Sequence, residues 1–167
     1  MSEFDLSSSS SATPKAKIIL AAVIAVALLF GWVAVRRQLG GMIAEMTPST
    51  DPNAPAAAEL ARSMAPSDPI TLWLKANLER NIFSPERTSA AIKLYEDTVR
   101  LSPNDFRWWI ELGRAYEQAE MNDRAEASLR QAIALAPTYT FPRWQFGNFL
   151  LRQGRTDEAF AEFKAAT

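Results

Sequence analysis

The sequence predicts an all-α protein in which one N-terminal transmembrane helix is followed by a short α-solenoid of about three helix-turn-helix repeats. Near the N-terminus, eighteen consecutive residues carry no charge, which is long enough to cross a bilayer. Beyond them, a pattern of large and small residues returns every 34 residues, and this period is typical of solenoids built from helix pairs. The 167 residues include neither His nor Cys. The commonest general base and the commonest transition-metal ligands are therefore missing, which favours binding over catalysis.

The uncharged run occupies residues 18–35, with Lys15 and Lys17 before it and Arg36 and Arg37 after it. At ~1.5 Å per residue, this helix would span roughly 27 Å of hydrocarbon. A cleaved signal peptide is the alternative, but no small-x-small site precedes the arginines, so we expect the chain to keep its anchor. The flanking charges balance, and the short N-terminal tail favours the cytoplasmic side. The repeats would then lie outside the cytoplasm, as in a single-pass protein of a bacterial inner membrane.

Four segments follow from the composition. We expect a disordered Ser-rich tail at residues 1–17, the transmembrane helix at 18–35, a Pro/Ala-rich linker at 36–69 and the repeat domain at 70–167. The linker contains five prolines between Pro48 and Pro69, a density that blocks long helices and favours a semi-extended spacer. A short helix over residues 56–64 and plain disorder also fit this segment.

The clearest copy of the repeated pattern runs from residue 106 to residue 139. Its positions 4, 7, 8, 11, 20, 24, 27 and 32 are Trp109, Leu112, Gly113, Tyr116, Ala125, Leu129, Ala132 and Pro137. These residues resemble the signature of the tetratricopeptide repeat (TPR) family. A degenerate copy precedes it at 72–105, where Lys75 and Glu79 replace the usual aromatic and small residues, and a truncated copy follows at 140–167. We expect six helices, at about 70–83, 85–101, 106–119, 123–135, 141–153 and 157–166.

Small residues mark the points where the two helices of a repeat should cross. Gly113 would face Ala125, and Gly147 would face Ala159, with large residues filling the space around each contact. The third copy stops at position 28, and no helix follows to cover it. We therefore expect Phe160 to be exposed, either because the array is truncated or because this face is a contact surface.

The TPR resemblance implies that the first helices of the repeats line a concave groove that binds peptides. Position 9 of successive copies is Arg80, Arg114 and Asn148, a polar ladder suited to the carboxylates and amides of an acidic or C-terminal peptide. The other groove residues that the resemblance implies are Arg107, Arg152, Trp73, Ile110, Phe141, Trp144 and Leu151.

Two further interpretations of this groove follow from the same residues. The arginines could instead form a solvated face, paired with Glu79, Glu111 and Glu117. The carboxylate clamp that holds chaperone C-termini is not expected, because Ala76 and Arg80 stand where the clamp needs Lys and Asn.

The preferred function is a membrane-anchored TPR scaffold or adaptor that recruits a protein or peptide at a bilayer, during envelope assembly, secretion or complex maturation. The alternatives are an oligomerisation module completed through the third repeat and an import-type receptor with cytosolic repeats. No acid/base constellation, phosphate loop, metal site or cofactor motif points to an enzyme. Residues 70–167 carry equal numbers of basic and acidic side chains, so nucleic acid is not an expected partner.

Overall fold

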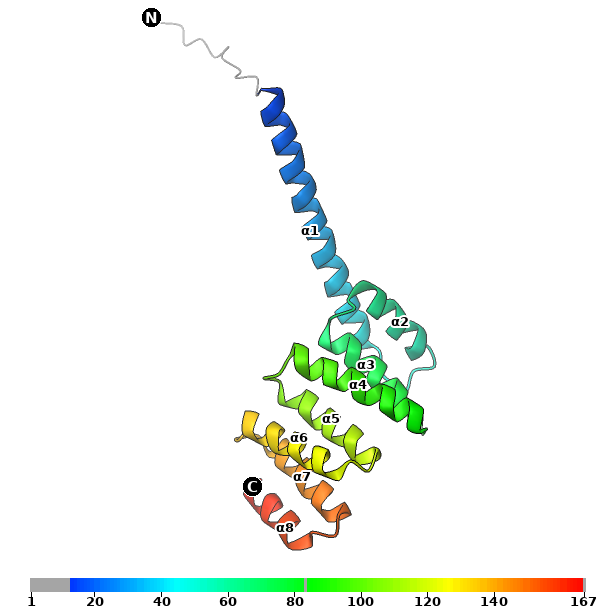
Figure 1. Cartoon of the computed structure of the whole chain (residues 1–167), viewed down its shortest axis with the longest axis vertical. Helices are drawn as coiled ribbons and strands as arrows, with labels where there is room; N and C mark the ends of the chain where they lie inside the picture. The colour runs from blue at the N-terminus through cyan, green and yellow to red at the C-terminus, as the bar shows by residue number, and fades with distance from the viewer. Residues whose placement is uncertain (1–12, 83, 167) are drawn as a thin grey trace, which may run out of the picture. The chain divides into compact units, whose positions relative to one another are not determined.

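The computed structural model describes residues 13–82 and 84–166, and in that part of the chain the only regular elements are eight α-helices (Figure 1). Their bounds are α1 Pro14–Met46, α2 Ala54–Met64, α3 Pro69–Arg80, α4 Pro85–Leu101, α5 Phe106–Gln118, α6 Asn122–Leu135, α7 Thr140–Arg152 and α8 Thr156–Ala165. The all-α prediction is confirmed. The chain divides into two compact units, one ending at Arg36 and the other beginning at Arg37.

The first unit is the apolar part of α1. This helix is long and apolar enough to cross a membrane by length and composition, and its large side chains, including Leu28 and Phe30, are exposed. The Ser-rich tail that we predicted for residues 1–17 falls outside the described residues as far as residue 12. From Pro14 onward the same segment is already helical, because α1 begins there.

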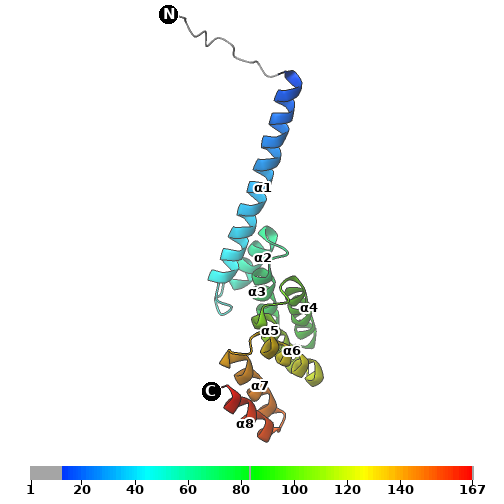
Figure 2. The same cartoon turned by 90° about the vertical axis from the view of Figure 1, so that its left-hand side faces the viewer.

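The second unit contains three helix pairs, α3–α4, α5–α6 and α7–α8, that follow one another as a solenoid (Figure 2). Each of the six helices ends within a few residues of its expected bounds. The residues before three of them are N-caps, which explains this agreement. The Asp68 carboxylate accepts from the backbone N–H of Ile70 at 2.9 Å, Ser84 accepts from Arg87, and Asp105 accepts from Arg107.

The segment 36–69 is not the spacer that we expected. The end of α1 and all of α2 are helical, and together they cover the outer side of α3, where Leu74 is fully buried among Ala44, Ala58 and Ala61. The prolines do not prevent this. Pro55 lies in the first turn of α2 and Pro69 in the first turn of α3, where a missing N–H costs no hydrogen bond.

Close contact of α1 with α2 depends on glycine. A Cβ placed on Gly40 would lie 2.7 Å from the Cβ of Ala65 and 2.8 Å from the carbonyl oxygen of Ala61, both nearer than van der Waals contact permits. The last turns of α1 and the helix α2 therefore pack against the first repeat as an additional helical layer of the solenoid.

The main core runs between the three pairs. Gly113 lies against the carbonyl of Ala125, as expected, and also against Leu129. The nearest neighbour of Gly147 is the ring of Phe163 rather than the expected Ala159, because this large side chain fills the space at the crossing. Trp108 is buried and contacts Trp73, with ring centroids 6.2 Å apart, so it joins the first repeat to the second.

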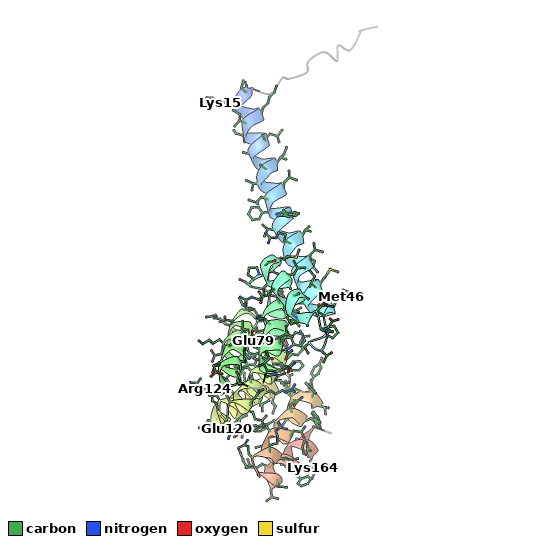
Figure 3. All side chains as sticks on the ribbon, turned by 90° about the vertical axis from the view of Figure 1, so that its right-hand side faces the viewer. Lys15, Met46, Glu79, Glu120, Arg124 and Lys164 are labelled. Atoms are coloured by element: carbon green, nitrogen blue, oxygen red, sulfur yellow. The ribbon has the colours of Figure 1, made fainter. Side chains whose placement is uncertain are left out.

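The turns inside the second and third repeats share an uncommon backbone conformation. Glu120 has φ 59° and Gly154 has φ 76°, and both residues stand at position 15 of their copies. Left-handed backbone costs a glycine little, whereas it is unfavourable for glutamate. Figure 3 labels Glu120 at this turn, and also Glu79 on α3.

Candidate peptide-binding groove

Two neighbouring hollows lie along the first helices of the three pairs, and nine of the ten predicted site residues line one or the other. The basic hollow, about 820 Å³, lies at the C-terminal ends of α3 and α5 and along α7. Its lining residues are Arg80, Asn81, Arg114, Glu117, Gln118, Trp144, Gln145, Asn148 and Arg152. The aromatic hollow, about 330 Å³, lies at their N-terminal halves. Its lining residues are Glu45, Ile70, Trp73, Arg107, Trp108, Ile110, Glu111 and Phe141. Leu151 lines neither hollow and is exposed.

Arg80 is held by the protein on several sides. Its guanidinium donates to Asn77 Oδ1 at 2.9 Å, pairs with Glu111 at 3.1 Å and lies 5.6 Å from the ring centroid of Tyr95. The Tyr95 hydroxyl donates to the same Asn77 oxygen at 2.8 Å. Only 12% of the Arg80 side chain is exposed. Arg80 therefore contributes charge to the hollow while both of its terminal nitrogens have partners inside the fold.

Arg114 is the open cation of the ladder. Its side chain is 45% exposed, and its guanidinium pairs with Glu111 at 3.3 Å. The third member of the ladder, Asn148, lines the basic hollow, and its side-chain amide donates to the carbonyl of Trp144 in its own helix at 3.0 Å. Arg114 thus has more donors free for a ligand than Arg80 has.

Arg152 makes a two-pronged ion pair with Glu117 that joins α7 to α5. The Arg152 Nε donates to Glu117 Oε1 at 2.5 Å, and its terminal nitrogen donates to Oε2 at 2.9 Å. These hydrogen bonds raise the pKa of Arg152 above its ordinary value. The interpretation of the arginines as a paired face is therefore right for Glu111 and Glu117. It is wrong for Glu79, which binds Lys75 and Arg87 instead.

Aromatic rings form the walls of the second hollow. Trp73 and Trp108 lie on one side, and Arg107 covers the Trp108 ring at 5.3 Å while pairing with its helix-capping neighbour Asp105. Hydrogen bonds from Arg107 lower the pKa of the Asp105 carboxyl. Half-exposed Phe141 stacks on Trp144 with centroids 6.3 Å apart, and this pair connects the aromatic hollow to the basic one.

Sequence reasoning missed several lining residues. Glu117 and Gln118 stand at positions 12 and 13 of the second copy, and the TPR resemblance assigns these positions to the groove together with position 2 of Arg107 and position 9 of Arg114. Gln118 also joins α5 to the end of α3, because its side-chain amide donates to the carbonyl of Arg80 at 3.1 Å. Glu45 could not have been found in this way, since it belongs to the segment that we expected to be a spacer.

A family comparison agrees with the succession of helix pairs. Residues 83–145 match the Tetratricopeptide repeat family. The matched TPR region covers α4, α5 and α6 and the start of α7, whereas the degenerate helix α3 lies outside it. A comparison with curated protein sequences found no match.

Solved structures share this TPR-type fold. A structure of MamA from residue 41 to its end, from Desulfovibrio magneticus RS-1, has a TM-score of 0.62 at 18% identity, covering 80% of this chain and 73% of that one. A crystal structure of MamA has a TM-score of 0.58 at 19% identity, covering 80% of this chain and 75% of the other. At such identities the similarity establishes the fold alone.

Proposed function

We propose that this protein is a membrane-anchored TPR scaffold that binds a segment of a partner protein in the groove formed by α3, α5 and α7. The observation that carries the proposal is the pair of adjoining hollows on these helices, one with three arginines and one with aromatic walls. Guanidinium groups bind carboxylates and main-chain carbonyls, and exposed aromatic rings bind apolar side chains at low entropic cost. The scaffold would serve envelope assembly, secretion or complex maturation at a bacterial inner membrane.

The assignment of the groove as a binding site is tested by reversing the charge at Arg114. The full chain in lipid nanodiscs would be screened against an arrayed library of synthetic peptides, with Arg114→Glu as the groove variant. Arg100→Glu is a matched control, because Arg100 also pairs with a carboxylate three residues earlier, Asp97, but lies on α4. We expect the wild-type chain and the control to bind the same peptides, and Arg114→Glu to bind them at least about tenfold more weakly. Identical binding by all three proteins would remove the groove assignment.

The membrane anchor is supported by the uncharged run in α1 with basic residues at both ends. Because the natural chain has no Cys, single cysteines can report the side of the membrane. We expect a membrane-impermeant maleimide to label Thr138→Cys, in the exposed turn after α6, in intact cells, and Ser10→Cys only after lysis. The opposite labelling would reverse the orientation, and release of the chain by alkaline carbonate would exclude the anchor.

Self-association is the second candidate function, and one observation favours it. Phe160 on α8 is 64% exposed, although the residue at the same position of the first repeat, Ile92, is buried in the core. A second copy could cover this face of α8.

A further inference from the structure

We infer that the ligand of this groove is an internal acidic segment with two or three carboxylates and one bulky apolar side chain about three residues away from them. The inference rests on the proposed function and adds the chemistry of the partner. It also assigns a role to Glu117 and Glu111, which compete with the ligand for the arginines of the groove.

Charge determines where the acidic part of the segment binds. Three arginines and one carboxylate line the basic hollow, whereas Glu45 and Glu111 outnumber Arg107 in the aromatic hollow. Arg107 is further neutralised by Asp105. Carboxylates of a ligand are thus attracted to the basic hollow and repelled from the aromatic one.

The spacing of the arginines favours an internal segment over a chain end. Arg80, Arg114 and Arg152 project from three successive first helices, and packed helices lie roughly 8–10 Å apart. Arg80 and Arg114 share the two oxygens of Glu111, whereas Arg152 binds Glu117, so the cations are grouped around two separate carboxylate positions rather than one. Such an arrangement suits carboxylates distributed along a segment, while a single terminal carboxylate would meet only one or two of these cations.

The internal ion pairs make an apolar anchor necessary. Glu117 occupies Arg152, and Glu111 bridges Arg80 and Arg114. A ligand carboxylate that replaces Glu117 exchanges one ion pair for another, so the net gain is small. The acidic residues would then supply selectivity and the apolar side chain most of the affinity, by filling the space beside Trp73, Trp108 and Phe141.

Helix geometry sets the distance between the two parts of the ligand. Trp73 and Arg80 are seven residues apart on α3, which corresponds to about 10 Å along the helix axis. An extended peptide covers this distance with about three residues, at ~3.3 Å each. The stacked rings of Phe141 and Trp144 lie between the hollows and give the intervening residues an apolar floor.

The test uses fluorescent twelve-residue peptides and the full chain in nanodiscs of zwitterionic lipid, with affinity measured by fluorescence anisotropy. The reference peptide carries three glutamates and one Phe three residues away. Four other peptides each differ from the reference in one feature. In the first the Phe is replaced by Ala, in the second all three Glu are replaced by Gln, in the third the Phe lies eight residues from the glutamates, and in the fourth the C-terminus is amidated. We expect each of the first three to lower the affinity at least about fivefold, and amidation to leave it unchanged. Loss of binding on amidation would overturn the inference in favour of a terminal carboxylate.

The competing carboxylates are tested by a gain of binding. Glu117→Gln should free Arg152 and tighten binding of the reference peptide about threefold or more, with no change for the peptide that has Gln in place of Glu. Glu126→Gln is the matched control, since Glu126 also holds an arginine of the next repeat, Arg155, but from α6. Weaker or unchanged binding by Glu117→Gln would contradict the role of Glu117.

Failure of this inference differs from failure of the proposed function. If peptides bind in an Arg114-dependent manner but without regard to acidity or spacing, only the ligand chemistry is wrong. If no peptide of any composition binds, the groove is not a peptide site and both proposals fail.

Discussion

In the first repeat a carboxylate lies where the two helices cross, whereas in the third repeat the same position is a glycine. Glu79, with 9% of its side chain exposed, accepts from Arg87 at 2.6 Å and pairs with Lys75 at 3.3 Å. Lys75 in turn binds Glu59 of α2 at 2.7 Å. This chain of charges joins α2, α3 and α4.

The third repeat has cations at the corresponding places but uses them differently. Arg143 and Arg155 stand 68 residues after Lys75 and Arg87. Arg143 pairs with Glu162, and Arg155 pairs with Glu126 and Glu158, while the ring of Phe163 fills the space beside Gly147. A buried carboxylate at the crossing therefore needs space as well as counter-charges. Cations at the right positions do not by themselves place a carboxylate there.

The largest effect on stability is expected from placing a glutamate, as at the first crossing, at the crossing of the third repeat. Gly147→Glu should lower the free energy of unfolding by about 3 kcal/mol or more, because its Cβ overlaps the Phe163 ring and its charge is buried without arranged partners. Chemical denaturation of the full chain in detergent micelles measures this. Adding Phe163→Ala should recover part of the loss. Ala161→Glu, on the exposed side of α8, is the control and should stay within about 0.5 kcal/mol of wild type.

A medium effect is expected from removing the charge at the first crossing. Glu79→Gln keeps the size of the side chain but leaves Lys75 and Arg87 without their shared carboxylate, which should cost about 1–2 kcal/mol after allowance for the exposure of both cations. Denaturation of the same micellar protein measures the change, with Glu120→Gln as an exposed control. Equal stability of Glu79→Gln and wild type would mean that the network contributes nothing.

The same variant should change the response to acid. Burial raises the pKa of Glu79, but the hydrogen bonds from Arg87 and Lys75 together lower it by more. The net pKa of Glu79 is therefore below the ordinary value of 4.5. A depressed pKa in the folded state stabilises the fold above the ordinary pKa, and this contribution is lost as the pH falls below it. Wild type should therefore lose stability between about pH 5 and pH 3 more steeply than Glu79→Gln, as unfolding midpoints would record. Parallel profiles would contradict the assignment.

The smallest effect on stability is expected at the outer face of α8. Phe160→Ser should change the free energy of unfolding by less than about 0.5 kcal/mol, because the ring is exposed. Ile92→Ser, at the same position two repeats earlier, should cost about 2 kcal/mol, because Ile92 is buried. If the chain self-associates through α8, Phe160→Ser should also weaken the dimer in analytical ultracentrifugation. A wild-type monomer at every concentration would exclude self-association.

Much of the solenoid could be predicted because its determinants are local and periodic. The spacing of Gly113, Ala125 and Leu129 repeats with the helix pair, and Ser84 and Asp105 cap the helices that follow them. The groove residues were placed through the same period, and nine of the ten line the two hollows. The hollows' binding of a peptide stays a prediction.

The contacts between repeats could not be predicted in this way. That Arg80 lies largely covered over the ring of Tyr95 while Arg114 is open depends on how α3, α4 and α5 are rotated against one another. Both residues stand at position 9 and look equivalent in the sequence. The separation of basic from aromatic side chains into two hollows depends on the same rotations.

By itself, the sequence determined that this protein has a long apolar helix and a solenoid of helix pairs, since hydrophobic period, caps and small residues act within about 34 residues of chain. Only the tertiary structure decided that the Pro-rich segment becomes a layer of the solenoid. The apolar side chain of Leu74 is buried by this layer, and Gly40 together with the alanines of α2 allows α1 and α2 to pack closely enough to form it. The tertiary structure also decided which arginines stay open, because ion pairing between repeats depends on distances that no local pattern encodes.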